Sequence, residues 1–529
     1  MSFESKILRN RHNNDYGFNI DQRYRQEEGA IWYEGKSENL KRFYTQNLTN
    51  LPNPSADFFT ANQSYFWKVV AAEPQTKTTH SGLPHAIIDT LISIIGKPEI
   101  KVNKKVLNEQ TKNYEIVEDL VLTDLLNEIL KDNNFQTLMD QDQLPYMLAV
   151  GDGAFFINYD KSISDFPMIV FSDGRNIEFE YKENRVVAIK RKTYFVEDNK
   201  TYMLEDIRTT TLEEDEKTKT KKRVATIEYN LYELANEKGQ VKQHVDLKTT
   251  EKTKGLEKTS YECFNQFIAV PTIYKLDKTT GRGKGMFSSK YDLLDDLDQN
   301  LSMSSTTTRR SAPVDYLPEE LMEYDDEGNR KKFNTFERKV MVYKNDLNSA
   351  TGVNQAMIET KQPVLNFEQY SSQALEILHN ILAGILSPAT LGIDLARDNN
   401  ATAQREKEKV TMITRDDLID FQTETIEKLC NLLLKVYFFN NNNIKQAKED
   451  YAIFVNYPEY ANPSFDSKLA VLAPVFASGA MSAKQYVNEL WGDSLTEEEK
   501  EEEIKKLEER QSAYNAPDEE PYDLFNIEG

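Results

Sequence analysis

The sequence predicts a mixed α+β fold in an elongated subunit, and three observations support this. Two amphipathic helices, near 287–308 and 366–386, flank a short β-rich insert, and a long helix near 402–438 follows them. The segment 154–247 alternates apolar and polar residues between turn signals, as antiparallel strands with one solvated face do. The region after Pro463 is helical again. Two medium helices around an insert, leading into one long helix, favour an elongated subunit over a compact one.

Length and composition indicate a folded chain of several subdomains. Its 529 residues exceed one ordinary domain. Apolar residues make up 39% and charged residues 29%, while aromatic residues are plentiful, with 27 Tyr and 26 Phe. This combination favours a folded protein with much solvent-facing or subunit-facing surface. The net charge is −22, whereas a protein that grips DNA phosphates is expected to be basic. The chain therefore either avoids nucleic acid or tolerates it without holding it.

Cysteine usage and hydropathy set further limits. Cys263 and Cys430 lie far apart, so we expect neither a disulfide framework nor a cysteine-based zinc site, and a reducing compartment fits. No run approaches the roughly 18 apolar residues of a membrane span, and none is expected. The stretch from Met1 to Gly29 is polar and lacks the apolar core of a signal peptide.

The N-terminal region is predicted to be mainly helical. The aromatic residues between Ile31 and Tyr44 fit a first helix and a turn, and we interpret them as core or interface packing. An apolar helix from His85 to Ile95 ends at Gly96-Lys97-Pro98, a typical stop signal. Further helical patterns are Ser64–Ala71, Ile116–Asp132 and Leu144–Val150.

A run of strands follows the turn Gly151-Asp152-Gly153. The predicted strands are Ala154–Tyr159, Met168–Phe171, Ile177–Tyr181, Val186–Phe195, Thr201–Ile207, Ala225–Leu234, Val241–Leu247 and Phe267–Leu276. The charged stretch from Glu213 to Arg223 is interpreted as a solvated hairpin tip. A nucleic-acid patch is the alternative, against which its acidic half argues.

Glycines and a lysine between a strand and a helix raise the question of a phosphate loop at Gly281-Arg282-Gly283-Lys284-Gly285. A P-loop needs Ser or Thr directly after its Gly-Lys pair, because that hydroxyl binds magnesium. Gly285 stands there instead, so the pattern fails. We interpret the segment as a flexible hinge that lets the following helix change its angle.

The helix near 287–308 has two distinct faces at helical spacing. Its apolar face holds Phe287, Tyr291, Leu294, Leu297 and Leu301, and its polar face holds Asp292, Asp295, Asp296 and Gln299. The second helix repeats the apolar seam with Phe367, Tyr370, Ala374, Leu378, Ile381 and Ile385, and His379 is expected to pack within it. The third helix has an apolar side from Val410 to Val436 and measures roughly 55 Å at 1.5 Å per residue.

The insert and the C-terminal region complete the chain. Short strands are predicted at Tyr316–Leu317 and Val340–Tyr343, and the acidic turn from Asp325 to Asn329 lacks the spaced ligands of a calcium loop. Ser387-Pro388 ends the second helix, and a loop reaches the cap of the third at Asn400. The last predicted elements are a strand at Tyr451–Asn456 and helices at Ser464–Phe476, Ser482–Trp491 and Thr496–Arg510.

Nothing in the sequence predicts catalysis. The five histidines, which are His12, His80, His85, His244 and His379, show no metal-binding spacing. Nucleophile-elbow, HExxH and Walker A patterns are missing from the sequence. Carboxylates are abundant, but abundance without a pocket-forming context does not identify a site. We therefore predict no catalytic, cofactor-binding or metal-binding residue, and no cofactor.

Four groups of short motifs follow one another in a characteristic order along the chain. They are Ile31-Trp32-Tyr33-Glu34-Gly35 with Leu40, Phe43 and Tyr44; Val150-Gly151-Asp152-Gly153-Ala154; Phe267 and Pro271 followed by Ser289–Ser302; and Leu391-Gly392-Ile393-Asp394 with Asn400–Lys407. In this order the chain resembles the portal proteins, or head-to-tail connectors, of tailed bacteriophages of Gram-positive bacteria. Each motif is only moderately specific, and their order and spacing make the case. The residues before Glu28 and the acidic C-terminal tail are not covered.

The resemblance implies a ring, usually of twelve subunits, at one capsid vertex, through which viral DNA is packaged and ejected. It implies an antiparallel β-rich wing, a helical stem, a small α/β clip and a helical C-terminal crown. The corresponding segments are the wing at 1–285, stem helices at 286–310 and 364–386, the clip at 311–363, a tunnel loop at 387–400, a long wing helix at 401–440, and the crown with its acidic tail at 441–529.

The resemblance also implies site residues. The stem residues that would line the channel are Asp292, Asp295, Asp296 and Gln299. The tunnel-loop residues that would touch DNA are Leu391, Asp394, Arg397 and Asp398. The clip residues that would dock the motor and the adaptor are Asp325, Asp326, Arg330, Lys331 and Lys332. An acidic lining fits a channel, because each tight contact between a cation and a phosphate would act as a brake on sliding DNA. The alternative for the aspartates is an ordinary solvated helix face.

The implied partners are further copies of the chain, double-stranded DNA held transiently without sequence preference, the large terminase subunit, a head–tail adaptor, and the major capsid and scaffolding proteins, with no membrane. The implied location is the portal vertex of the virion, after assembly in the host bacterial cytoplasm. Two alternatives stay open. One is a capsid or adaptor protein without a DNA channel, and the other is an enzyme of nucleic-acid processing, such as a packaging motor or nuclease.

Overall fold

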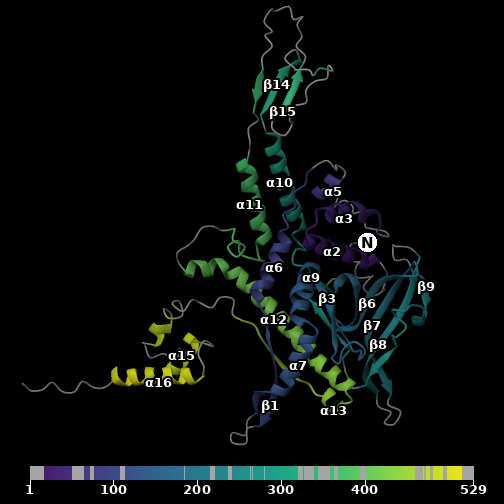
Figure 1. Cartoon of the computed structure of the whole chain (residues 1–529), viewed down its shortest axis with the longest axis vertical. Helices are drawn as coiled ribbons and strands as arrows, with labels where there is room; N and C mark the ends of the chain where they lie inside the picture. Colours follow the sequence, from purple (N-terminus) through teal and green to yellow (C-terminus); the bar gives the residue numbers. More distant parts are fainter. Residues whose placement is uncertain are drawn as a thin grey trace, which may run out of the picture. The chain divides into compact units, whose positions relative to one another are not determined.

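The chain forms two units, Met1–Pro458 and Glu459–Gly529. Helices and antiparallel sheets both occur, so the predicted α+β class is confirmed (Figure 1). The computed structural model describes residues 17–50, 65–71, 77–107, 114–183, 185–214, 221–235, 241–262, 264, 266–278, 280–311, 313–319, 326, 339–343, 358–362, 367–393, 401–458, 469, 472–476, 481–491 and 497–514.

The N-terminal helices pack through their aromatic residues, as expected. The helices are α2 (Gly17–Glu34), α3 (Ser37–Asn50), α5 (Phe66–Ala71) and α6 (Leu83–Ile95). Trp32 and Trp67 are both fully buried. Helix α6 ends where the sequence predicted, at Gly96, whose φ of 75° lies in the left-handed region that glycine adopts without strain.

The next region contains one difference from the prediction. The helix expected to start at Ile116 starts at Leu120, because Ile116 lies in a strand, β2 (Tyr114–Glu118), paired with β1 (Glu99–Leu107). The Asp119 side chain accepts from Leu122 N at 3.4 Å and so caps the new helix start. The remaining helical elements here are α7 (Leu120–Asp132), α8 (Phe135–Leu138), the π-helical turn η1 (Met139–Gln143) and α9 (Leu144–Val150).

The predicted strands are present, and they form two antiparallel sheets. One sheet has the order β11-β3-β4, and the other has the order β10-β8-β7-β6-β5 with β9 paired to β8. Strands β7 and β8 pair as far as Glu214 and Lys221, which confirms the hairpin; its tip lies outside the described residues. The bounds are β3 (Asp152–Asn158), β4 (Met168–Asp173), β5 (Ile177–Lys182), β6 (Arg185–Glu197), β7 (Lys200–Glu214), β8 (Lys221–Leu234), β9 (Val241–Val245), β10 (Thr259–Tyr261) and β11 (Ala269–Ile273), with short 3-10 turns η2 (Gly174–Asn176) and η3 (Leu247–Thr249).

The predicted long helix is also present, as α12 (Ala401–Asn440), and only part of it belongs to the core. Its C-terminal half packs with β3 and α7, where Phe155, Leu126 and Leu433 are fully buried in one cluster. In the other half, Val410 and Ile413 are 40% and 55% exposed. The described residues of the chain therefore leave much of these two apolar side chains uncovered.

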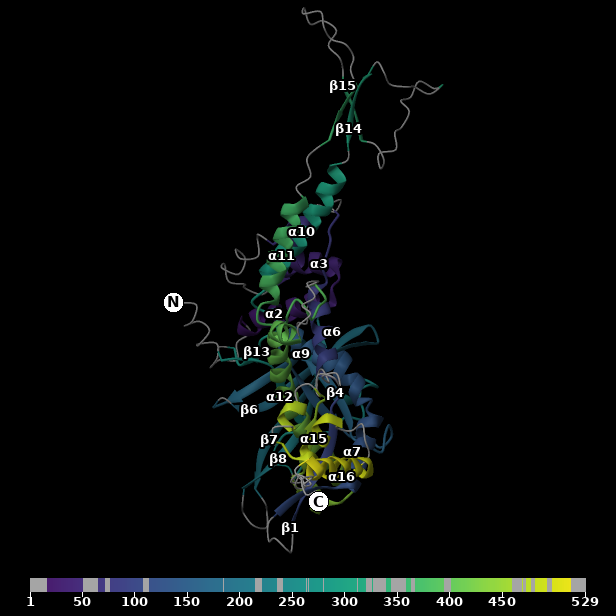
Figure 2. The ribbon, with the colours of Figure 1, turned by 90° about the vertical axis from the view of Figure 1, so that its left-hand side faces the viewer.

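Two helices and a small sheet occupy the centre of the sequence. Helices α10 (Tyr291–Arg310) and α11 (Phe367–Leu382) lie side by side in both views (Figure 2). Between them in sequence, β14 (Val314–Pro318) pairs in parallel with β15 (Lys339–Tyr343) and antiparallel with β16 (Glu359–Lys361), which confirms the predicted strands. His379 is exposed, so the prediction that it packs in the seam is wrong; it lies on the side of α11 away from the buried Ile377 and Ile381.

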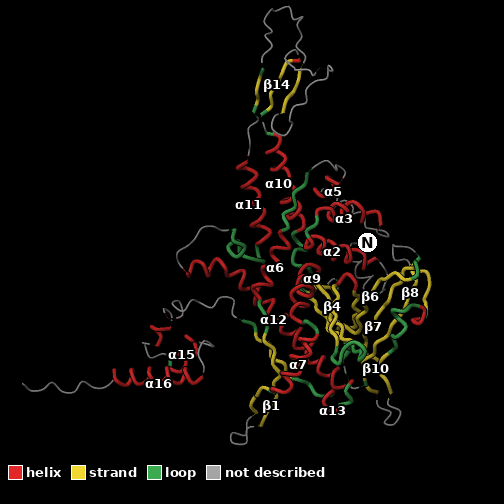
Figure 3. Tube along the Cα trace, viewed as in Figure 1, coloured by secondary structure: helices red, strands yellow, loops and turns green. Residues whose placement is uncertain are grey.

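The last elements divide between the two units. Helix α13 (Ile444–Ala447) and strand β17 (Ala452–Asn456) belong to the first unit, because β17 pairs with β1. The second unit contains α15 (Ala483–Trp491) and α16 (Glu497–Tyr514), drawn in red in Figure 3, and both were predicted. None of the described helices combines the length and apolar character needed to cross a membrane.

Candidate functional site

Helices α10 and α11 form an antiparallel pair held by polar contacts at both ends. The Lys290 ammonium, just before α10, donates to the carbonyl oxygens of Asn380 at 2.6 Å and Ala383 at 3.0 Å. A cation there satisfies the last carbonyls of α11 and complements its dipole. Along the pair, Asn300 Nδ2 donates to Gln373 Oε1 at 3.0 Å. These contacts fix the two helices relative to each other.

The pair is covered on few sides by the described part of the chain. On α11, only Ile377, Ile381 and Leu382 are buried. Phe367 is 61% exposed and Leu375 48% exposed, although both are apolar. Exposed apolar residues that gather on one element favour an interface with another molecule.

The polar face predicted on α10 divides into two parts. Asp296 and Gln299 are exposed, as a solvent-facing stripe requires, and so is Asp292, which accepts from the Tyr65 hydroxyl at 2.6 Å. Asp295 is only 4% exposed, so its expected place on a channel wall is wrong. Its carboxylate accepts from Phe66 N at 2.6 Å and from Trp67 N at 3.3 Å, because the helix turns this position toward α5.

Asp298, which was not among the predicted site residues, is fully buried on the same side of α10. It accepts from Trp67 Nε1 at 3.1 Å and Ser81 N at 2.8 Å, and its Oδ2 lies 2.6 Å from His80 Nδ1. One turn further, Ser302 Oγ accepts from Thr79 N at 2.8 Å. The signal in the sequence was the spacing 295, 298 and 302, which places three polar side chains on one helical face beside the apolar one.

The carboxylate of Glu28, on α2, also faces α10. Glu28 Oε1 accepts from the Tyr44 hydroxyl at 2.7 Å, and that hydroxyl accepts from Trp32 Nε1 at 2.9 Å. Burial raises the pKa of Glu28 to about 7, although the hydrogen bond from Tyr44 acts in the opposite direction. Burial likewise raises the pKa of Asp295 to about 7, against the effect of its two backbone hydrogen bonds. We call Glu28, Asp292, Asp295 and Asp298 the carboxylate seam.

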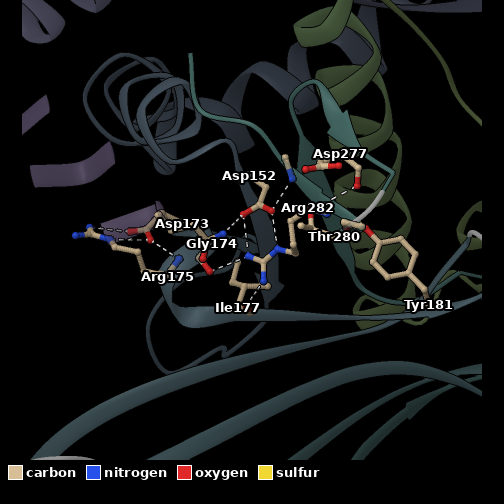
Figure 4. Close-up of polar contacts among 12 residues, drawn as sticks. Asp152, Asp173, Gly174, Arg175, Ile177, Tyr181, Asp277, Thr280 and Arg282 are labelled. Atoms are coloured by element: carbon tan, nitrogen blue, oxygen red, sulfur yellow. Dashed lines mark hydrogen bonds and ion pairs between the residues drawn. The ribbon is translucent and has the colours of Figure 1, made fainter. Parts of the chain in front are cut away.

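The start of α10 is fixed by a different network, shown in Figure 4. Arg282 is 7% exposed, and its guanidinium reaches both oxygens of Asp152, at 2.6 and 2.8 Å. The same guanidinium donates to the carbonyls of Ile177 at 3.0 Å and Gly174 at 2.8 Å. Asp152 also accepts from Gln26 Nε2 and Gly283 N, each at 2.9 Å. Every charge in this network is paired.

The prediction of a flexible hinge at 281–285 is therefore wrong. Close backbone packing adds to the ion pair, because a Cβ on Gly283 would collide with the Gly151 carbonyl, and one on Gly285 with that of Ala149. Gly151 has a φ of 105°, a conformation that other residues rarely adopt. Directly after this segment, Met286 N donates to Leu148 O at 2.7 Å. The glycines allow close packing here, not motion. We call Gly281–Gly285 with Asp152 the glycine joint.

The other predicted site residues are only partly described. Leu391 lies half-buried in the turn that follows α11, where Thr390 and Thr411 hydroxyls lie 2.8 Å apart. Asp326 is exposed in a turn. The remaining predicted positions lie outside the described residues: Asp325, Arg330, Lys331, Lys332, Asp394, Arg397 and Asp398.

The described residues contain no group of three His, Cys, Asp or Glu side chains arranged to hold a metal ion. The contacts described above fix a largely exposed helical pair to the body of the first unit at two places. No protein-family model and no curated protein matches this chain.

Proposed function

We propose that this chain is a portal subunit of a tailed bacteriophage, one of a ring of about twelve copies around a channel for double-stranded DNA; the number follows the family resemblance of the sequence. The observation that carries the proposal is the α10–α11 pair. Two antiparallel helices enclose a small three-stranded sheet in the sequence and lead into a helix of 40 residues, in the order that the resemblance implies. In this proposal α10 and α11 are the stem and the small sheet is the clip.

Uncovered apolar side chains support assembly into a ring. Phe367 and Leu375 on α11, Met303 on α10, and Val410 and Ile413 on α12 are each at least 40% exposed. These side chains lie on the stem and on the helix that follows it. Specific interfaces bury such residues, and neighbouring copies in a closed ring would do so for every subunit at once.

Charge supports the passage of DNA. Asp296, Gln299 and Asp292 remain exposed on α10, and the chain carries a net charge of −22. A wall that repels phosphates keeps a duplex centred and free to slide in both directions, because no cation holds it. In this proposal the segment 387–400 is the tunnel loop, and DNA is packaged and ejected without sequence preference.

The proposed partners follow from the same assignment. The clip would dock the large terminase subunit during packaging and the head–tail adaptor afterwards. The wing would face the major capsid and scaffolding proteins. The protein would then reside at the portal vertex of the virion.

Negative-stain microscopy of the purified full chain tests the proposal. We expect closed rings with a central hole wide enough for a B-form duplex. In packaging assays, Asp296→Lys combined with Asp292→Lys should leave rings intact and slow DNA passage, because new cations would bind phosphate. A matched substitution of two exposed acids on the wing, Glu257→Lys with Glu251→Lys, should not slow it. Particles that never close, or packaging that is unchanged in the stem variant, would refute the proposal.

A further inference from the structure

The contact between the N-terminal helices and α10 concentrates negative charge in a buried place. Of the carboxylate seam, Glu28 is 5% exposed, Asp295 4% and Asp298 0%. Glu28 comes from α2, and the other members of the seam come from successive turns of α10. Carboxylates of like charge at such proximity disfavour one another's ionised form.

The hydrogen-bond donors of the seam are mostly neutral. Hydroxyl groups of Tyr44 and Tyr65 bind Glu28 and Asp292, and backbone amides of α5 bind Asp295. Asp298 receives an indole N–H and a backbone amide. Neutral donors stabilise a carboxylate less than a cation does.

Few cations face the seam from the elements packed around it. The positive charge of Arg25, on α2, lowers the pKa of Glu28, but Arg25 is exposed to solvent. The His80 ring, 2.6 Å from Asp298, gains a positive charge only when it is protonated. Helix α3 contributes the neutral Tyr44, and Tyr65 directly precedes α5. The exposed Asp296 on α10 adds further negative charge. Negative charge therefore exceeds positive charge among the described groups.

We propose that this contact is a pH-sensitive latch, which holds α5 against α10 more tightly when Glu28 and Asp295 are protonated. A protonated carboxyl group still accepts from the amides of Phe66 and Trp67 through its oxygens, so the hydrogen bonds survive while the repulsion disappears. The latch requires no DNA and no ring, so it stands independently of the proposed function.

The direction of the effect follows from linkage between protonation and folding. The pKa values of Glu28 and Asp295 lie near 7 in the folded chain, above the ordinary carboxyl value of about 4. The closed contact thus binds more protons than the open one between these values. Its stability is complete below about pH 4 and falls as the pH rises to about 7.

Amide hydrogen exchange of the full chain between pH 5 and pH 8 tests the latch. We expect the protection of the 65–71 segment, corrected for the intrinsic exchange rate, to fall at least about tenfold from pH 5.5 to pH 7.5, since each bound proton contributes up to tenfold per pH unit. A corrected protection of this segment that stays unchanged between the two pH values would overturn the proposal.

Isosteric variants locate the effect. Glu28→Gln combined with Asp295→Asn cannot lose the protons in question, so its 65–71 segment should show less than half of the wild-type pH slope on a logarithmic scale. Glu376→Gln, a change of the same kind on the exposed face of α11, should keep the wild-type slope. A double variant that retains the whole slope would contradict the latch. If the double variant does not fold, the single variant Asp295→Asn should still lose part of the wild-type slope, and retention of the whole slope by that variant would contradict the latch.

Discussion

The glycine joint and the carboxylate seam hold the same helix, α10, by opposite electrostatic designs. At the joint, Arg282 and Asp152 neutralise each other, and four further hydrogen bonds join the pair to backbone groups and to Gln26. In the seam, buried carboxylates receive mainly neutral donors. Both contacts are well packed and hydrogen-bonded, so the difference between them is charge balance.

This difference teaches where the molecule is rigid and where it responds to conditions. A buried ion pair with all its hydrogen bonds satisfied has one stable arrangement, and neither partner is easily removed. A buried group with unbalanced charge changes its protonation near neutral pH and changes the strength of its contact with it. The start of α10 is thus fixed, while its side contact with the N-terminal helices is adjustable.

The largest expected effect comes from breaking the ion pair of the joint. Arg282→Ala leaves Asp152 buried without its cation, and we expect the free energy of unfolding to fall by about 3–5 kcal/mol. Urea denaturation, followed through the unfolding transition of the first unit, measures this change in the free energy of unfolding. Arg175→Ala is the control, because Arg175 is paired with Asp173 but is partly exposed, and it should lose no more than about 1 kcal/mol. Equal losses would mean that the joint has no special role.

A smaller effect is expected from the seam. Asp298→Ala removes the acceptor of Trp67 Nε1 and Ser81 N, and these buried donors are left unsatisfied, so about 2–3 kcal/mol should be lost. Asp296→Ala, two positions away and exposed, should change the free energy of unfolding by about 0.5 kcal/mol or less. The same urea titration, followed by tryptophan fluorescence, compares the two. If Asp296→Ala lowers the free energy of unfolding as much as Asp298→Ala does, burial does not explain the contribution of Asp298.

The sequence predicted elements better than it predicted contacts. Periodicity located α10, α11, α12 and the strands from β3 to β9, because helix and strand periods depend on nearest neighbours in sequence. The same periodicity placed Asp295 on a wet face and His379 in a packed seam, and the structure reverses both. Which face of a helix meets another element depends on residues more than two hundred positions away, such as Phe66 and Trp67.

The glycine segment shows the same limit more clearly. Gly281–Gly285 reads locally as a hinge, because glycine is permissive when nothing surrounds it. In the fold, Gly151 and Ala149 lie so close that only glycine fits, and the chain is locked. Asp152, the partner of Arg282, stood in one of the motifs that carried the family resemblance, but no local pattern pairs it with Arg282. Only the tertiary arrangement distinguishes a joint from a hinge.

The smallest expected effect on unfolding concerns the exposed face of α11, which contacts neither the glycine joint nor the carboxylate seam. Phe367→Gln and Leu375→Gln change exposed positions of α11, and glutamine is a good helix former, so the protomer should lose about 0.5 kcal/mol or less. Sedimentation velocity should nevertheless show weaker self-association, because these side chains are proposed to be covered by a neighbouring copy. Glu376→Gln on the same helix is the matched control and should associate as the unchanged chain does. If instead the two variants unfold easily and associate normally, α11 is covered from within the chain, and the contrast between fixed anchors and a free outer face no longer holds.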